Sequence, residues 1–116
     1  MNQMILNTSS DVIIKVSNEW KIMEFNPAAE KFFGKKHIET VNQNFIHLFV
    51  PNIEQKKIEN DLNKLIQEGL NANYKMPVVI SGGKRVLIEW TANVHLNSLK
   101  IATEMIIIAK NNQNHE

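Results

Sequence analysis

The run from Arg85 to Leu96 has an apolar side chain at every second position from Val86 to Val94. Its apolar members occupy one side of an extended chain: Val86, Ile88, Trp90, Ala92 and Val94. Successive side chains of a strand point to opposite faces of a sheet. The run therefore predicts a long strand with one buried face, and such a face needs partner strands and a covering layer.

Two further strands flank this run. Tyr74–Ile80 precedes it across Ser81–Lys84, whose Gly82-Gly83 pair can adopt the positive φ values of a hairpin turn. Pro77 cannot donate a ladder hydrogen bond, so we expect an edge position or a bulge for the first of these strands. Ile101–Lys110 follows the long run and predicts a final strand, with Ile106 and Ile108 on the face opposite Met105, Ile107 and Ala109.

The first third of the chain predicts a hairpin and a helix. Asp11–Ser17 places β-branched residues on one face at period two, and Lys21–Phe25 resumes as a second strand after a polar turn. Asn26 before Pro27 is a helix start, because the Asn side chain caps a free N–H and proline suits the first helical position. Gly34 ends this helix as a C-terminal cap.

The middle of the chain predicts helices. Lys35–Pro51 favours one or two short helical turns around an apolar cluster. A longer helix is expected from Ile53 to Glu68, ended by Gly69, because its apolar residues follow the helical stripe. The residues of that stripe are Ile58, Leu62, Leu65 and Ile66.

These elements predict one α+β domain, a five-stranded antiparallel sheet with helices packed on one face, which buries all the apolar sides at once. We expect an N-terminal cap segment at 1–10, the domain at 11–110 and a flexible tail at 111–116.

Composition excludes several classes of function. The 13 Lys and Arg residues nearly balance the 12 Asp and Glu residues, so the chain lacks the strong positive electrostatic field that favours binding of nucleic acid. The absence of cysteine excludes disulfides, thiolate nucleophiles and Cys-ligated metals. No apolar stretch approaches the roughly 20 residues that a bilayer requires, so we expect no membrane insertion by this segment.

Catalytic motifs are also missing. The histidines show no metal-ligand spacing, and the chain has neither a nucleophile elbow nor a phosphate-binding loop. We therefore expect no catalytic residue, no metal and no enzyme activity. One alternative is a small α+β cone enzyme of the steroid-isomerase type with Glu89 as general base, although strand alternation puts Glu89 opposite the apolar face.

Three segments resemble the PAS domains of bacterial signalling proteins. Ile5–Ile14 is similar to the start of their first strand, Phe25–Gly34 to their second strand and first helix, and Gly83–Ala92 to their fourth strand. The resemblance covers about Met4 to Lys110. Asn42 stands where many relatives have glycine, and asparagine tolerates the left-handed backbone conformation that such a glycine can adopt. Asn111-Asn112-Gln113 replaces a closing Asp-Ile-Thr motif through which relatives join an output helix.

The resemblance implies a cytoplasmic sensory or regulatory module of a larger protein, such as a two-component histidine kinase or a cyclic-dinucleotide enzyme. Its ligand would lie between the inner face of the sheet and the middle helices, against Ile14, Phe45, Leu48, Ile58, Leu62, Ile88, Trp90, Met105 and Ile107. Trp90 is the residue most expected to touch a ligand, because a buried indole N–H needs an acceptor; the alternative is a packed Trp bonded to a backbone carbonyl.

We expect no cofactor. Haem-binding relatives use a histidine on the long middle helix, and Ile53–Glu68 contains none, which leaves His47 as the nearest. Light-sensing flavin relatives need a cysteine.

Self-association without a ligand is the main alternative function. Ile106 and Ile108 on the outer face, near Leu87, need cover, which a second subunit of a homodimer or the Met4, Ile5 and Leu6 segment would provide.

Overall fold

The computed structural model describes residues 11–69 and 71–109. The strands are β1 (Val12–Ser17), β2 (Ile22–Phe25), β3 (Ala72–Val79), β4 (Arg85–Leu96) and β5 (Ala102–Ala109). The helices are α2 (Pro27–Phe33), α3 (His37–Thr40), α4 (Phe45–Phe49) and α5 (Gln55–Glu68), with short 3-10 turns η1 (Asn52–Glu54) and η2 (Ser81–Gly83).

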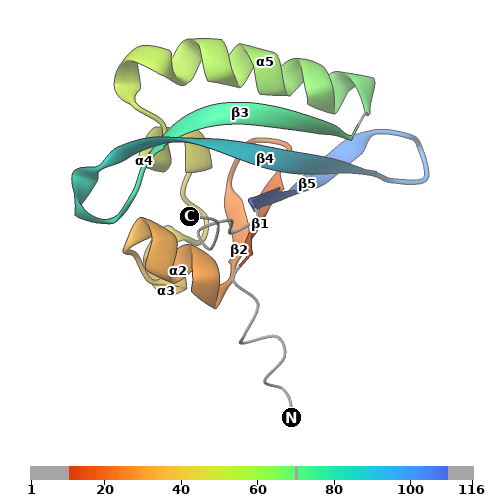
Figure 1. The fold of residues 1–116 in the computed structure, drawn as a ribbon. Helices are drawn as coiled ribbons and strands as arrows, with labels where there is room; N and C mark the ends of the chain where they lie inside the picture. The colour runs from red at the N-terminus through yellow and green to blue at the C-terminus, as the bar shows by residue number, and fades with distance from the viewer. Residues whose placement is uncertain (1–10, 70, 110–116) are drawn as a thin grey trace.

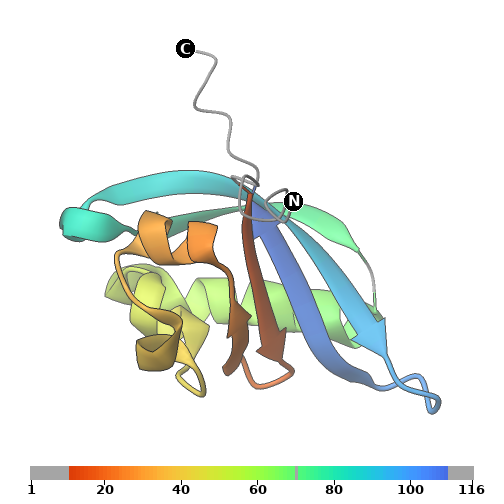
Figure 2. The ribbon, with the colours of Figure 1, turned by 90° about the horizontal axis from the view of Figure 1, so that it is seen from below.

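The strands form one sheet in the order β2-β1-β5-β4-β3, and every pairing is antiparallel. Figure 1 shows α5 lying along β3, and Figure 2 shows the strands in front of α5 with α2 to α4 beside them. The predicted α+β fold, a five-stranded antiparallel sheet with helices on one face, is confirmed.

Strand alternation decides which residues enter the core. Val12, Ile14 and Val16 of β1 are all buried, and Ile13 between them is exposed. In β4, Trp90 is 1% exposed and Ala92 2%, whereas Leu87 on the opposite face is 64% exposed. The predicted inner and outer faces of both strands are confirmed.

The end of β2 and the start of α2 are joined through one side chain. Asn26 Oδ1 accepts hydrogen bonds from the Ala29 N–H at 2.9 Å and the Ile13 N–H at 3.1 Å. Its Nδ2 donates to the Asp11 carbonyl at 3.0 Å. The predicted N-cap is confirmed, and the same asparagine ties the helix to β1.

The predicted edge position of Pro77 is also confirmed, because β3 is the last strand of the sheet. The Ser81–Lys84 connection contains Gly82 at φ 83° and Gly83 at φ 81°, the left-handed conformation expected of the glycine pair. Asn42 adopts φ 69°, as its substitution for a common glycine suggested.

Several predicted boundaries were wrong by a residue or two; the third strand, for example, is Ala72–Val79 and not Tyr74–Ile80. The second strand begins at Ile22, because Lys21 instead forms an isolated bridge with Asn44. The long helix begins at Gln55, because the residues after Pro51 form the separate turn η1. The N-terminal segment with Met4, Ile5 and Leu6, the residue Lys110 and the tail 111–116 lie outside the described residues.

The end of α2 is packed tightly against η2. Gly34 caps the helix at φ 75°, and a Cβ atom on it would lie 2.8 Å from Ser81 Oγ and 3.2 Å from Ser81 Cα. Helix α2 and the β3–β4 connection therefore pack at a distance that is possible only because Gly34 has no Cβ atom.

Replacement of two left-handed glycines by alanine separates strain from steric contact. Gly82→Ala should lower the free energy of unfolding by about 1 kcal/mol through backbone strain alone, because a Cβ there meets nothing within 4 Å. Gly34→Ala should lower it by about 1 kcal/mol more, since Ser81 must also move. Urea unfolding measures both, and equal losses would contradict the close approach.

Candidate functional site

The nine residues predicted to line a ligand site all lie in one hydrophobic core cluster. Ile14, Phe45, Ile58, Leu62, Trp90, Met105 and Ile107 are buried in it, and Leu48 and Ile88 pack against it half-buried. They come from strands β1, β4 and β5 and from helices α4 and α5. The fold therefore brings together residues that are up to ninety-three positions apart in the chain.

Trp90 lies among aromatic rings at the centre of this cluster. Its ring stacks on Phe33, with centroids 6.4 Å apart, and meets the edge of Phe45 at 6.0 Å. Its Nε1 is buried and has no hydrogen-bond acceptor among the described residues. The alternative of a Trp bonded to a backbone carbonyl is therefore not what the structure has.

An unpaired buried donor carries a cost. Leaving such a group unsatisfied costs about 1–3 kcal/mol relative to a bonded one. The other tryptophan of the chain, Trp20, is also buried, but its Nε1 donates to Asn63 Oδ1 at 3.0 Å. The core of this domain thus pairs one indole N–H and leaves the other available to an acceptor.

Phe33 is a residue of this site that sequence reasoning missed. Its ring lies 4.1 Å from that of Phe49 and 5.9 Å from that of Phe25, in addition to its contacts with Trp90 and Phe45. The helical position of Phe33 was predicted. Its contact with a strand tryptophan, however, depends on how α2 crosses the sheet, and no local pattern encodes that crossing.

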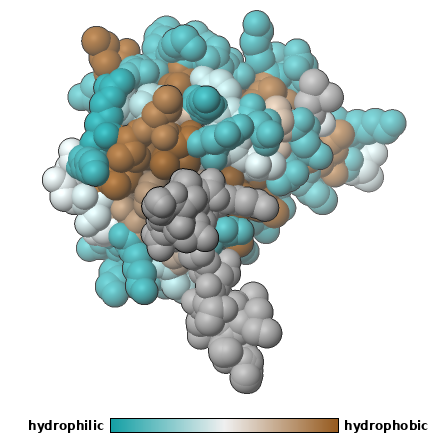
Figure 3. Space-filling model, viewed as in Figure 1, coloured by the Kyte–Doolittle hydropathy of each residue, from teal (hydrophilic) through white to brown (hydrophobic). Residues whose placement is uncertain are grey.

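The inner face of the sheet is incompletely covered near the β3–β4 end. Val86 and Ile88 of β4 and Phe32 of α2 pack against the core only half-buried. The half-burial of these three side chains leaves the edge of the core accessible between β4 and α2. Figure 3 shows that apolar surface also lies along this half of β4 on the side away from α5.

Polar contacts hold α5 over β3. Tyr74 Oη donates to Asp61 Oδ2 at 2.7 Å, and Lys57 Nζ donates to the same oxygen at 2.9 Å. These two donors hold the pKa of the Asp61 carboxyl below its usual value. Burial, together with the hydrogen bond to Asp61, raises the pKa of Tyr74. An ion pair between Arg85 and Glu54 also joins β4 to η1.

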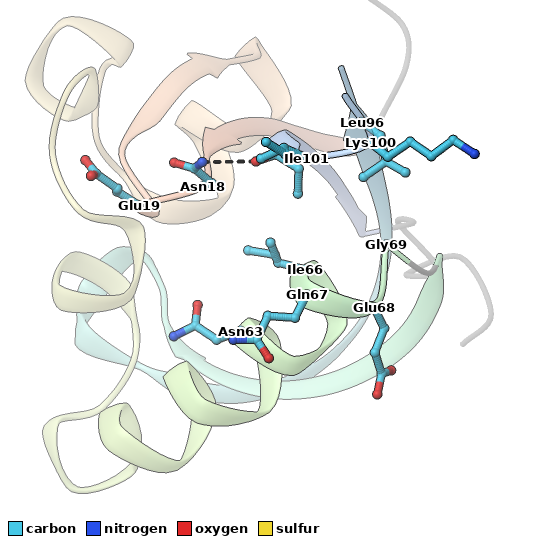
Figure 4. A pocket seen from close by; sticks show the side chains of 11 residues that line it. Asn18, Glu19, Asn63, Ile66, Gln67, Glu68, Gly69, Leu96, Lys100 and Ile101 are labelled. Atoms are coloured by element: carbon cyan, nitrogen blue, oxygen red, sulfur yellow. Dashed lines mark hydrogen bonds between the residues drawn. The ribbon is translucent and has the colours of Figure 1, made fainter. Parts of the chain in front are cut away.

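A second feature is a cavity of about 590 Å³ at the opposite end of α5. It lies among the end of α5, the β1–β2 turn and the β4–β5 hairpin, and Figure 4 shows the residues around it. None of the nine predicted site residues lines it. Sequence reasoning missed this cavity because its residues come from three separate segments, the β1–β2 turn, α5 and the β4–β5 hairpin, and no local pattern encodes how these segments meet.

Glu89 does not have the surroundings of a buried general base. It is exposed on the outer face, directly opposite Lys75 in the antiparallel register. Within residues 11–69 and 71–109, no three His, Cys, Asp or Glu side chains are grouped as metal ligands. None of the described helices is long and apolar enough to span a membrane.

A five-stranded antiparallel sheet with helices over one face and an apolar core between them defines the chain as a small α+β domain. Residues 1–108 match the PAS fold family, so the chain belongs to that family, whose members are sensory domains of signalling proteins. A comparison with curated proteins finds no match.

Solved structures of PAS domains share the fold. A PAS domain from Colwellia psychrerythraea is 11% identical with a TM-score of 0.81, over 94% of this chain and 92% of that one. The PAS domain of the Cronobacter turicensis quorum-sensing receptor RpfR, in complex with BDSF, is 18% identical with a TM-score of 0.74, over 90% and 95% of the two chains. A PAS domain of a two-component sensor histidine kinase is 11% identical with a TM-score of 0.73, over 92% and 89%.

The Tyr74–Asp61 contact predicts a pH-dependent loss of stability. Tyr74→Phe should lower the free energy of unfolding by about 1 kcal/mol at neutral pH. Because the folded pKa of Asp61 is lowered, the contribution is present above the ordinary value of 3.8 and is lost as the pH falls through the folded pKa. Urea unfolding from pH 7 downward measures the difference. In an Asp61→Asn background the effect of Tyr74→Phe should not vary with pH through this range.

Proposed function

We propose that this domain is the regulatory input module of a larger cytoplasmic signalling protein, such as a histidine kinase or a cyclic-dinucleotide enzyme, and that it binds a small ligand in its core. The site is the predicted cluster between the inner face of the sheet and the helices, with Phe33 added. Binding would favour one arrangement of sheet and helices, by an amount limited to the ligand's differential affinity for the two arrangements.

The observation that carries this proposal is the unpaired indole N–H of Trp90. Buried polar groups are normally hydrogen-bonded, so a buried donor without an acceptor favours a guest that supplies one. The aromatic surroundings favour a largely apolar guest, and the half-buried Val86 and Ile88 suggest where it enters. An apolar molecule with an oxygen acceptor meets both requirements.

The PAS domain of RpfR supplies a probe, because it has also been solved in complex with C12:0. Native mass spectrometry of protein purified without additives should detect a bound small molecule. Titration with C12:0, followed by heteronuclear NMR, should shift the indole N–H of Trp90. Trp90→Phe should weaken this binding by about tenfold, the value of one hydrogen bond.

Leu87→Gln is the matched control. Leu87 lies on the same strand, but its side chain is 64% exposed on the outer face, so C12:0 affinity should not change. Equal affinities of Trp90→Phe and the unaltered chain would contradict the role of Trp90. Absence of both a co-purified molecule and C12:0 binding would contradict the core as a ligand site.

Self-association is a second candidate function, favoured by apolar side chains on the outer face. Ile13 lies directly opposite Ile108 in the register of β1 and β5, and Ile106 is the next outward residue of β5. Ile13 is 37% exposed and Ile106 36%. Lys15 borders this group and pairs with Glu104 at 3.4 Å and Glu24 at 3.7 Å.

Leu87 lies apart from this group, contrary to expectation. Ile108 is in register with Thr91, so Leu87 is four residues further along β4, about 13 Å at the rise of a strand. The central part of a dimer surface would therefore be Ile13, Ile106 and Ile108, with Leu87 at its margin. We propose that Met4, Ile5 and Leu6 also contribute to this dimer contact.

Sedimentation velocity over a concentration series tests this surface. The unaltered chain should sediment as a dimer, and Ile106→Gln should shift it towards monomer, because burial of a polar amide without a partner disfavours the contact. Ile53→Gln, at a position 87% exposed on η1, should leave the dimer unchanged. A monomer at every concentration, with and without residues 1–9, would exclude self-association.

A further inference from the structure

Hydrogen bonds within the β4–β5 hairpin hold its conformation beside the cavity at the end of α5. On the hairpin side, the Asn97 Oδ1 atom accepts from the Leu99 N–H at 2.8 Å and the Ile101 N–H at 3.1 Å. The backbone N–H of Asn97 also donates to the Ile101 carbonyl at 2.9 Å. These bonds fix the β4–β5 hairpin in the conformation that presents Ile101 to the cavity.

Three apolar side chains and two amide groups line the part of the cavity between α5 and the hairpin. Figure 4 shows the Ile66 and Ile101 side chains extending toward one another from α5 and from the hairpin, with Asn18 on one side and Asn63 on the other. Leu96 completes the apolar lining. A guest therefore meets hydrocarbon in the middle and amide groups at the sides.

Hydrogen-bond partners fix the orientation of both amides. Asn63 Oδ1 accepts from Trp20 Nε1 at 3.0 Å, and an indole nitrogen is only a donor. Asn18 Nδ2 donates to the Ala102 carbonyl at 3.0 Å, and a carbonyl is only an acceptor. This leaves Asn63 Nδ2 as a donor and Asn18 Oδ1 as an acceptor, neither with a partner among the described residues.

Charge in the lining is confined to the rim. Glu19, Glu68 and Lys100 are exposed, and in Figure 4 their side chains point away from the space between Ile66 and Ile101. Leu96 and Ile101 are themselves 38% and 54% exposed, so the space stays partly open to water, and a charged group placed there gains no partner of opposite charge from the two amides. The lining therefore selects against charged guests.

We propose that this cavity is a second binding site, separate from the Trp90 core, for an uncharged amphipathic molecule whose polar group both donates and accepts hydrogen bonds, as a primary amide does. The apolar part lies against Ile66, Leu96 and Ile101. The polar group accepts from Asn63 Nδ2 and donates to Asn18 Oδ1. The volume of about 590 Å³ is within the range of small-molecule sites.

Three probes with six carbon atoms each test the charge selection: hexanamide, hexanoate and hexylammonium. Titrated into the isotope-labelled full chain, hexanamide should shift the backbone resonances of Asn18, Ile66 and Ile101 and the indole N–H of Trp20. The indole N–H of Trp90 should stay in place, which separates this site from the core. The two charged probes should bind at least about fivefold more weakly, because each lacks half of the amide's hydrogen bonding to Asn63 Nδ2 and Asn18 Oδ1.

Variants test the roles of individual side chains. Asn63→Asp keeps an oxygen for Trp20 but replaces the free donor by a carboxylate oxygen. The affinity for hexanamide should therefore fall about fivefold, and hexylammonium should bind more tightly. The indole resonance of Trp20 reports whether its hydrogen bond survives. Ile101→Asn should also lower the affinity for hexanamide. Leu99→Asn is the matched control on the same hairpin: Leu99 is 75% exposed, does not line the cavity, and should have no effect.

Three results would overturn the proposal. Hexanoate or hexylammonium binding as tightly as hexanamide would remove the charge selection. Hexanamide shifts confined to Trp90 and its neighbours would assign the probe to the core. No shift of Asn18, Ile66 or Ile101 with any probe would show that the cavity binds no molecule of this class, whatever the core binds.

Discussion

The one-sided burial of β4 is the constraint on which the rest of this domain depends. Alternation places Trp90 and Ala92 inward with almost no exposure, while Leu87 and Glu89 face out. A sheet that is apolar on one face must be covered there. Helices α2 to α5 provide the cover, and the antiparallel pairings around β4 hold the inner residues in register with those of β3 and β5.

The aromatic core leaves one buried polar group, the indole N–H of Trp90, without a hydrogen-bond partner among the described residues. Phe33 and Phe45 surround Trp90 with rings, which cannot act as strong acceptors for its indole N–H. Trp20, in contrast, is near Asn63 of α5 and is paired. The difference comes from position, because Trp20 follows the β1–β2 turn within reach of the Asn63 side chain, whereas Trp90 lies on β4 among aromatic rings.

The two ends of the domain differ in how the helices meet the hairpins. At the β3–β4 end, Gly34 packs onto Ser81 and Arg85 pairs with Glu54, so α2 and η1 both contact the hairpin. At the β4–β5 end, the hairpin is internally bonded through Asn97 but leaves a cavity beside α5. Rigid elements with space between them are the arrangement expected of a binding site.

Local chemistry in the sequence determined the elements of this protein: the alternation through Trp90, the Asn26 cap and the glycine stops all act within a few residues. Strand order and helix crossing were decided only by the tertiary structure, because they depend on which apolar faces fit together across the whole chain. For the same reason the sequence predicted that Trp90 is buried but not that its N–H lacks an acceptor. It also contained no sign that Asn18, Asn63 and Ile101, from three separate segments, would surround one cavity.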